Sequence, residues 1–276
     1  MLHIFIHTLE DLIKIIPFLF IAFLVMEYLE HGVKKKANIL KNNKFSVLIG
    51  SILGVIPQCG FSVMATNLFS SKVITMGTLI AIYLSTSDEM LPLLISNNVP
   101  FQTIGLILLT KVLVGIIIGY VIDLFFKKKN NNEYSICDDD NCHCENGIFK
   151  SSLIHTLKIS LFIFITTLIL NILIHELGLE KISTFLLKDN FFGPFISCLI
   201  GLIPNCASSI LITEMYLSGV ISTGMLIGGL LTGSGIGILV LFKVNKNIKE
   251  NLIILSIIYL TGVLVGILFD LLNIVF

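Results

Sequence analysis

The chain has 276 residues, of which 55% are hydrophobic and only 13% are charged. Soluble domains carry about 25% charged residues, so this composition excludes an ordinary soluble domain and predicts an all-α protein that crosses a membrane several times. The formal net charge is zero, and the basic residues are scattered in short loops, which argues against a nucleic-acid partner. The lipid bilayer is the partner that this composition predicts.

An internal repeat dominates the sequence. Residues 54–87 and 201–234 align without a gap at an offset of 147 positions, and 14 of the 34 aligned residues are identical. The offset pairs Pro57 with Pro204, and it pairs a Gly-x3-Gly-x3-Asp pattern at 115–123 with a second one at 262–270. Such self-similarity predicts two copies of one structural unit, with residues 1–129 as the first copy, 130–150 as a polar linker and 151–276 as the second copy.

The first copy begins with an apolar run at 12–28, which we expect to be retained as a span because it lacks the features of a cleaved signal peptide. After Glu30 and His31, the loop from Lys34 to Lys44 holds five lysines and no acidic residue, which predicts a cytoplasmic loop and an external N-terminus. The remaining expected elements of this copy are a broken apolar run at 45–69, a span at 73–95 interrupted at 85–89, and a span at 103–126 that ends at three lysines.

Pro57 divides the run at 45–69 into two parts of about 12 residues, whereas a helix needs about 20 to cross a bilayer. Backbone groups freed by a break cannot be satisfied by lipid, so the segment must be buried in protein or line a wet cavity. Two structures fit this pattern: a helical hairpin that enters and returns, or two short spans that meet at depth.

The linker at 130–150 is the most polar stretch of the chain. Because three lysines directly precede it, the linker is expected on the cytoplasmic side of the membrane. The second copy is expected to contain a span at 153–174, a broken run at 191–216 around Pro204, a span at 220–242 and a span at 252–274.

Three lysines of the second copy are grouped at 243–249, in the place of the uncharged loop at 97–102 in the first copy. Equivalent loops should therefore lie on opposite sides of the membrane. The predicted fold is an all-α polytopic protein with two inverted-topology repeats of about five helices each, including broken or re-entrant hairpins. Such repeats are typical of secondary transporters whose site lies where broken helices meet. The predicted location is the plasma membrane, with the C-terminus outside.

The two breaks offer a matched set of donors. Each carries a carboxamide, a thiol and, three residues later, a hydroxyl on the same helical face. Thiols favour thiophilic metals and metalloids, although a membrane cysteine is also a common small apolar filler. The predicted substrate-binding residues are Gln58, Cys59, Ser62, Asn205, Cys206 and Ser209.

Three carboxylates are candidates for binding a coupling cation or proton: Asp88, Glu89 and Glu214. A carboxylate at membrane depth is costly and is functional by default. The alternative is that Asp88 and Glu89 stand at the outer interface.

The linker combines thiols, an imidazole and carboxylates, with Cys137, Cys142, His143 and Cys144 as candidate metal ligands. Their spacing matches no standard zinc pattern, and a solvated tether is the alternative reading.

Three functions remain open from the residues alone: outward transport of a metal or metalloid ion, transport of an organic or inorganic anion coupled to protons or cations, and thiol redox chemistry between Cys59 and Cys206. The chain has no Walker-type nucleotide motif, so we do not expect ATP-driven transport or an enzyme. No cofactor is required beyond a bound metal ion, and the sequence leaves open whether the chain forms a homo-oligomer.

The repeated frame Gly-x-Ile-Pro-x-Cys at 54–59 and 201–206, with the stretch Ser-Thr-Ser-Asp-Glu at 85–89, resembles the ten-span heavy-metal exporters of the ArsP-like permease group. Members of that group carry names such as arsenic efflux protein or manganese transporter. The resemblance covers nearly the whole chain, and it implies an integral permease of two five-helix repeats that exports a metal or metalloid.

Overall fold

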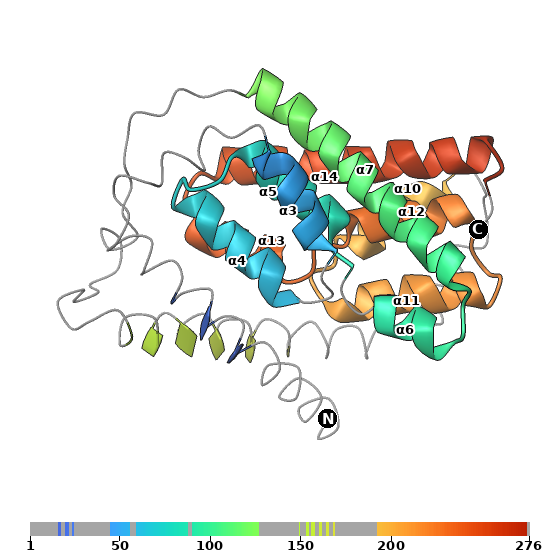
Figure 1. Cartoon of the computed structure of the whole chain (residues 1–276), viewed down its shortest axis with the longest axis horizontal. Coiled ribbons are helices and arrows are strands. Elements are labelled where there is room, and N and C mark those ends of the chain that lie inside the picture. The colour runs from blue at the N-terminus through green and yellow to red at the C-terminus, as the bar shows by residue number, and fades with distance from the viewer. Residues whose placement is uncertain are drawn as a thin grey trace.

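The computed structural model describes residues 45–55, 59–87, 90–126 and 192–274, with scattered positions between 16 and 24 and between 149 and 168. Every regular element in these ranges is an α-helix (Figure 1). The first block contains α3 (Ser46–Gly54), α4 (Cys59–Ser70), α5 (Met76–Ser85), α6 (Met90–Ser96) and α7 (Phe101–Phe125). The second contains α10 (Gly193–Gly201), α11 (Cys206–Leu217), α12 (Thr223–Thr232), α13 (Gly237–Val244) and α14 (Ile248–Leu271).

The helices of the two blocks correspond in order and spacing. Each helix of the second block begins 147 residues after its counterpart in the first, which is the offset of the sequence alignment. One element differs from the sequence expectation, because the segment at 220–242 is not a continuous helix. It is interrupted between Thr232 and Gly237, where Gly235 adopts a φ of 57° that few residues other than glycine tolerate.

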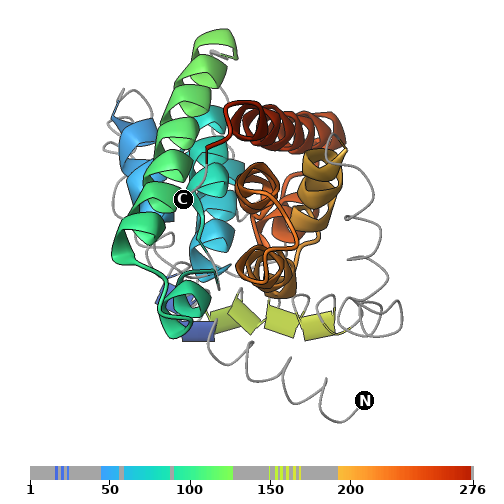
Figure 2. The ribbon, with the colours of Figure 1, turned by 90° about the vertical axis from the view of Figure 1, so that its right-hand side faces the viewer.

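Four helical stretches among the described residues are long and apolar enough to cross a membrane: Met76–Ser96, Phe101–Phe125, Thr223–Val244 and Ile248–Leu271. Only 28% and 33% of the apolar windows of α7 and α14 are buried, against 75% for α5–α6 and 89% for α12–α13. The two continuous helices therefore expose apolar faces that suit lipid, while the two interrupted helices form the interior (Figure 2). The prediction of an all-α polytopic membrane protein is confirmed.

Helices α3 and α4 are too short to span a bilayer singly. Helix α3 runs beside α5, with Ser46 Oγ 3.1 Å from Thr78 Oγ1 near the start of α5. At the other end, a Cβ atom on Gly54 would meet Ser85 Oγ, in the last residue of α5. Helix α4 then leads back to the loop before α5. Because α3 begins and α4 ends at the same end of α5, the pair has the course of a hairpin that enters and returns.

Helices α10 and α11 follow the same course. A Cβ atom on Gly193 would meet the Met225 side chain near the start of α12, and one on Gly201 would lie 2.3 Å from Thr232 Oγ1 at its end. These contacts correspond to those of α3 along α5.

The interior helices pack closely against the continuous ones. A Cβ atom on Gly77 would lie 2.2 Å from the Gly119 carbonyl oxygen, and one on Gly224 would lie 2.2 Å from that of Gly266. Glycine therefore permits direct backbone contact between α5 and α7 and between α12 and α14. The Gly-x3-Gly spacing noted in the sequence marks this contact in both blocks.

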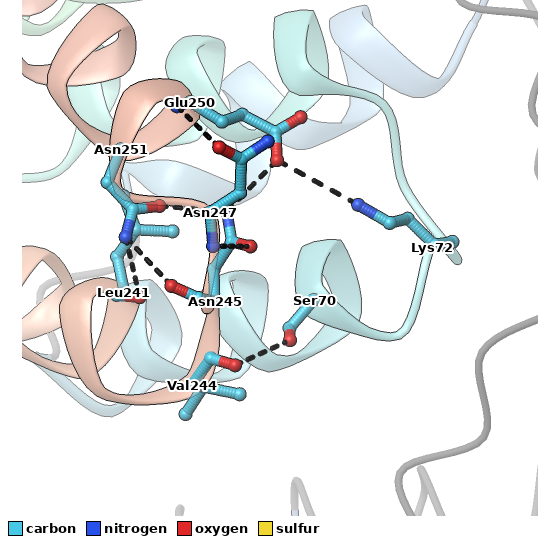
Figure 3. Close-up of polar contacts among 8 residues, drawn as sticks. All are labelled: Ser70, Lys72, Leu241, Val244, Asn245, Asn247, Glu250 and Asn251. Carbon is cyan, nitrogen blue, oxygen red and sulfur yellow. Dashed lines mark hydrogen bonds and ion pairs between the residues drawn. The ribbon is translucent and has the colours of Figure 1, made fainter. Parts of the chain in front are cut away.

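The two blocks also pack against each other. Helix α4 lies beside α13, α6 beside α11, and α5 against α12 (Figure 1). At one end of the molecule Ser70 Oγ donates to the Val244 carbonyl oxygen at 3.3 Å, and Lys72 Nζ lies 3.9 Å from Glu250 Oε2 (Figure 3). The loop between α4 and α5 is thus adjacent to the loop between α13 and α14.

Candidate functional site

The two helices of each hairpin are separated at 55–58 and at 202–205. We call each of these segments, together with the first turn of the helix that follows it, the first tip (55–62) and the second tip (202–209). In each hairpin the returning helix begins at a cysteine, Cys59 for α4 and Cys206 for α11. The structure describes the backbone of both cysteines but not their side chains. The matched frame of the sequence therefore corresponds to matched helix starts, where unpaired N–H groups and the positive end of the helix dipole are found.

The first tip lies against the interruption between α5 and α6. Ser87 Oγ, within this interruption, donates to the carbonyl oxygen of Val55 at 2.5 Å. The end of α10, which precedes the second tip, lies against the corresponding end of α12, because Thr232 Oγ1 donates to the Cys198 carbonyl oxygen at 3.0 Å and a Cβ atom on Gly201 would meet Thr232 Oγ1. The first tip and the helix end that precedes the second tip are therefore held beside the helix interruptions of their own blocks.

Ser62 lies between the two blocks and is fully buried. A Cβ atom on Gly237, the first residue of α13, would lie 3.1 Å from Ser62 Oγ and 3.0 Å from Tyr83 Cε1. The Thr66 hydroxyl donates to the Ser62 carbonyl oxygen at 2.7 Å and shares a 2.5 Å hydrogen bond with the Tyr83 hydroxyl. The helix that begins in the first tip therefore packs against the interruption of the opposite block, as a site between the two copies requires.

Asn205 and Ser209 of the second tip are also buried. Ser208 Oγ donates to the Asn205 carbonyl oxygen at 2.8 Å, and Thr213 Oγ1 donates to that of Ser209 at 2.7 Å. Glu214, in contrast, is exposed, so the structure does not bring its carboxylate to the buried side of α11.

Several predicted site residues lie outside the described residues: Gln58, Asp88, Glu89, Cys137, Cys142, His143 and Cys144. Within the ranges that the structure does describe, no group of three His, Cys, Asp or Glu side chains could hold a metal ion.

Asn67 Nδ2, in the last turn of α4, and Ser234 Oγ, between α12 and α13, are buried and have no hydrogen-bond partner in the described structure. The counterpart of Ser234 is Ser87, which does have a partner. An unsatisfied buried donor costs free energy and calls for an explanation such as a ligand site.

Lys111, in the middle of α7, is not among the residues that the sequence pattern predicted. This side chain is only 1% exposed. Its ammonium donates to the carbonyl oxygen of Thr86 and, at 2.8 Å, to that of Leu230. The available signal was a lone lysine inside a 25-residue apolar helix, because an ionisable residue at membrane depth is a functional candidate by default.

A second overlooked residue is Cys198 of α10, a buried free cysteine. Cβ atoms on Gly228 and Gly262 would each lie 3.1 Å from its sulfur, so this thiol fills a small space between helices.

One family model matches the chain, in two overlapping segments at residues 1–158 and 146–274; its description is "Putative, 10TM heavy-metal exporter". No curated protein and no solved structure matches.

Proposed function

This chain belongs to the ArsP_2 family of ten-span heavy-metal exporters, and from that membership we propose that it is a secondary transporter that moves a metal or metalloid ion outward by alternating access. The substrate would bind between the two tips, at Cys59 and Cys206 with Gln58, Asn205, Ser62 and Ser209. Asp88 and Glu89 would bind a coupling cation or proton, with Glu214 as a third candidate at an exposed position of α11.

The observation that carries this proposal is the contact between the α4–α5 loop and the α13–α14 loop. In the first copy, the α4–α5 loop precedes the α5–α6 span and the α6–α7 loop follows it, so these two loops lie at opposite ends. The counterpart of the α6–α7 loop is the α13–α14 loop, which contacts Ser70 and Lys72. This arrangement supports two copies that are turned over relative to each other, as in alternating-access transporters.

The position of the tips also favours a shared site. Ser87 contacts Val55 at the first tip, Thr232 contacts the end of α10 before the second tip, and Lys111 contacts both Thr86 and Leu230. These contacts, through residues that are neighbours in the chain, lead from the first tip to the end of α10.

Charge supports an orientation for this transporter. Lys72 lies at the end of the molecule that contains the α13–α14 loop, and Lys243, Lys246 and Lys249 are in or beside that loop. By the positive-inside rule this end would be cytoplasmic, and α14 would then carry the C-terminus to the outside of the plasma membrane.

Metal transport into everted membrane vesicles tests the proposal. We expect the double variant Cys59→Ser/Cys206→Ser to lose transport of thiophilic ions, whereas Cys198→Ser retains it because that cysteine lies outside the tips. Equal transport by the wild type and the double variant, for every thiophilic ion, would contradict binding by the tip thiols. Loss in Asp88→Asn with full activity in the cysteine variants would instead favour a coupled anion transporter.

The linker is a separate part of the proposal. If Cys137, Cys142, His143 and Cys144 capture metal for delivery, their joint replacement by serine should raise the metal concentration needed for half-maximal transport and leave the maximal rate unchanged. A change in the maximal rate alone would contradict a capturing role.

A further inference from the structure

Lys111 is a buried charged side chain that the second copy of the repeat lacks. Its counterpart there is Ile258 of α14, which is also fully buried. The charge is therefore a feature of the first copy and not of the repeated unit. Among the side chains that the structure describes as buried, Lys111 is the charged one, and a buried charge is retained only where it is compensated.

Two acceptors of the Lys111 ammonium are carbonyl groups at helix ends. Thr86 is the C-terminal cap of α5, and Leu230 lies in the last turn of α12. If α12 continued, the N–H of Ser234 would donate to the Leu230 carbonyl oxygen, but it donates to that of Thr232 at 2.9 Å instead. Both carbonyls belong to the negative ends of helix dipoles, which attract a cation.

These acceptors belong to different copies of the repeat, Thr86 to the first and Leu230 to the second. In transporters with discontinuous helices, such C-terminal carbonyls coordinate the coupling cation. Here the ammonium of a neighbouring helix occupies that position, fixed by the backbone of α7.

We propose that the carbonyl oxygens of Thr86 and Leu230 form a monovalent-cation site that this chain fills with its own ammonium group, and that Lys111 thereby joins the two interrupted helices. Lys111 is a positioning residue, because it acts on the tips through the helix ends that adjoin them. Any movement of one copy against the other that separates these two carbonyls must break one of its hydrogen bonds. The site is independent of which substrate is transported.

Removal of the ammonium should leave a site that small cations can fill. The test compares the melting temperature of detergent-purified full-length Lys111→Met with that of Ile258→Met, which places the same side chain at the counterpart position. The salts are the chlorides of N-methylglucamine, sodium, potassium, ammonium and methylammonium at equal ionic strength. N-methylglucamine is too large for the site, so its chloride controls for the general screening of charges by salt.

In N-methylglucamine chloride we expect Lys111→Met to melt roughly 5–10 °C below the wild type, because the substitution leaves two buried carbonyl oxygens without the ammonium that donates to them. At least one of the small cations should recover most of that loss. Ile258→Met and the wild type should show no such preference for one cation. A wild-type melting temperature for Lys111→Met, or a loss that is equal in all five salts, would overturn the proposal.

A neutral donor provides the second variant. Lys111→Gln keeps an N–H group without the charge, and we expect it to fold with an intermediate melting temperature that small cations raise. A wild-type melting temperature without any response to salt would show that charge is not needed and would overturn the proposal, even if Lys111→Met does not fold. Because the readout is stability, a failure of metal transport would not affect this result.

Discussion

Asn251, at the junction of α13 and α14, is a buried polar residue with three hydrogen bonds. Its Nδ2 donates to the carbonyl oxygens of Asn245 at 2.9 Å and Leu241 at 3.4 Å, and its Oδ1 accepts from Asn245 Nδ2 at 2.8 Å (Figure 3). Lys72 and Glu250 in the same view are partly exposed, and their charges are 3.9 Å apart. The buried amide should therefore contribute more to stability than the ion pair.

This difference predicts unequal effects of two substitutions. Asn251→Ala should lower the free energy of unfolding by about 1–3 kcal/mol, because it leaves buried groups of the turn without partners. Lys72→Gln should change it by less than about 1 kcal/mol. Unfolding in a mixed-detergent titration measures both values. A larger loss for Lys72→Gln would mean that the ion pair, and not the amide, holds this junction.

Gly77 illustrates how much a single methyl group matters at the helix contacts. An added Cβ would lie 2.2 Å from the Gly119 carbonyl oxygen and 2.5 Å from Asp123 Oδ1, and the backbone of α7 cannot yield locally. Gly77→Ala should destabilise the chain by about 1–3 kcal/mol, as other overpacked substitutions do.

Gly105 supplies the matched control, because a Cβ there has no atom within 4 Å. Gly105→Ala should be neutral or stabilise the chain by up to about 1 kcal/mol, since alanine favours the helix. The same detergent titration compares both variants. Equal losses of unfolding free energy at the two positions would show that backbone freedom, and not close packing, explains the glycine spacing that both copies repeat.

At the scale of helices, α5 and α12 begin with the same three-part cap. The cap hydroxyls of Thr75 and Ser222 each accept from a backbone N–H at 3.1 Å. The carboxylates of Asp123 and Asp270, at the ends of α7 and α14, accept from those hydroxyls at 2.7 and 3.0 Å and from the N–H groups of Gly77 and Gly224 at 2.9 and 3.0 Å. Each carboxylate thus fastens the start of an interior helix to the end of its continuous neighbour.

The matched caps predict matched losses. Asp123→Ala and Asp270→Ala should each cost about 1–2 kcal/mol of unfolding free energy, as the loss of a capping carboxylate does elsewhere. The corresponding asparagine variants retain one acceptor oxygen and should cost less. Denaturation of the four single variants in parallel gives the comparison. A large loss of unfolding free energy for one aspartate variant and none for the other would show that the two caps do not stabilise their helices equally.

The helix interruptions show what the sequence could and could not predict. Pro57 and Pro204 predict the two tips, because a proline interrupts the hydrogen bonds of a helix and lipid cannot satisfy the backbone groups that are freed. The interruption after Thr232 escaped prediction, since Gly233 and Gly235 lie in an otherwise apolar run and isolated glycines are tolerated in membrane helices. The aligned segment at 85–89, which is polar, was the available clue.

Comparison of the two copies explains which site residues the sequence could suggest. It singled out Ser62, Asn205 and Ser209, and the structure buries all three; that they bind a substrate stays a prediction. Lys111 belongs to what the copies do not share, because its counterpart is Ile258. The partners of Lys111 are backbone carbonyls, whose positions depend on how the two blocks pack and leave no trace in the residue types.

At the scale of the whole molecule, the two copies predict a specific topology. The α6–α7 loop and the α13–α14 loop occupy equivalent positions in the repeat. If the copies are inverted, one loop faces the outside and the other faces the cytoplasm. If they are related by a rotation about the membrane normal, both face the same side. Asn97 and Lys246 are exposed residues in these loops and can report the difference.

In a version of the chain without its native cysteines, we expect Asn97→Cys to react with a membrane-impermeant maleimide added to intact cells. Lys246→Cys should react only after the membrane is opened, because the lysines around it favour the cytoplasmic side. Everted vesicles should reverse this pattern and so control for the reactivity of each thiol. Labelling of both cysteines from the same side would contradict the inverted arrangement of the two copies. Without that inversion, a movement that opens one copy to the outside would not be equivalent to the movement that opens the other copy to the inside.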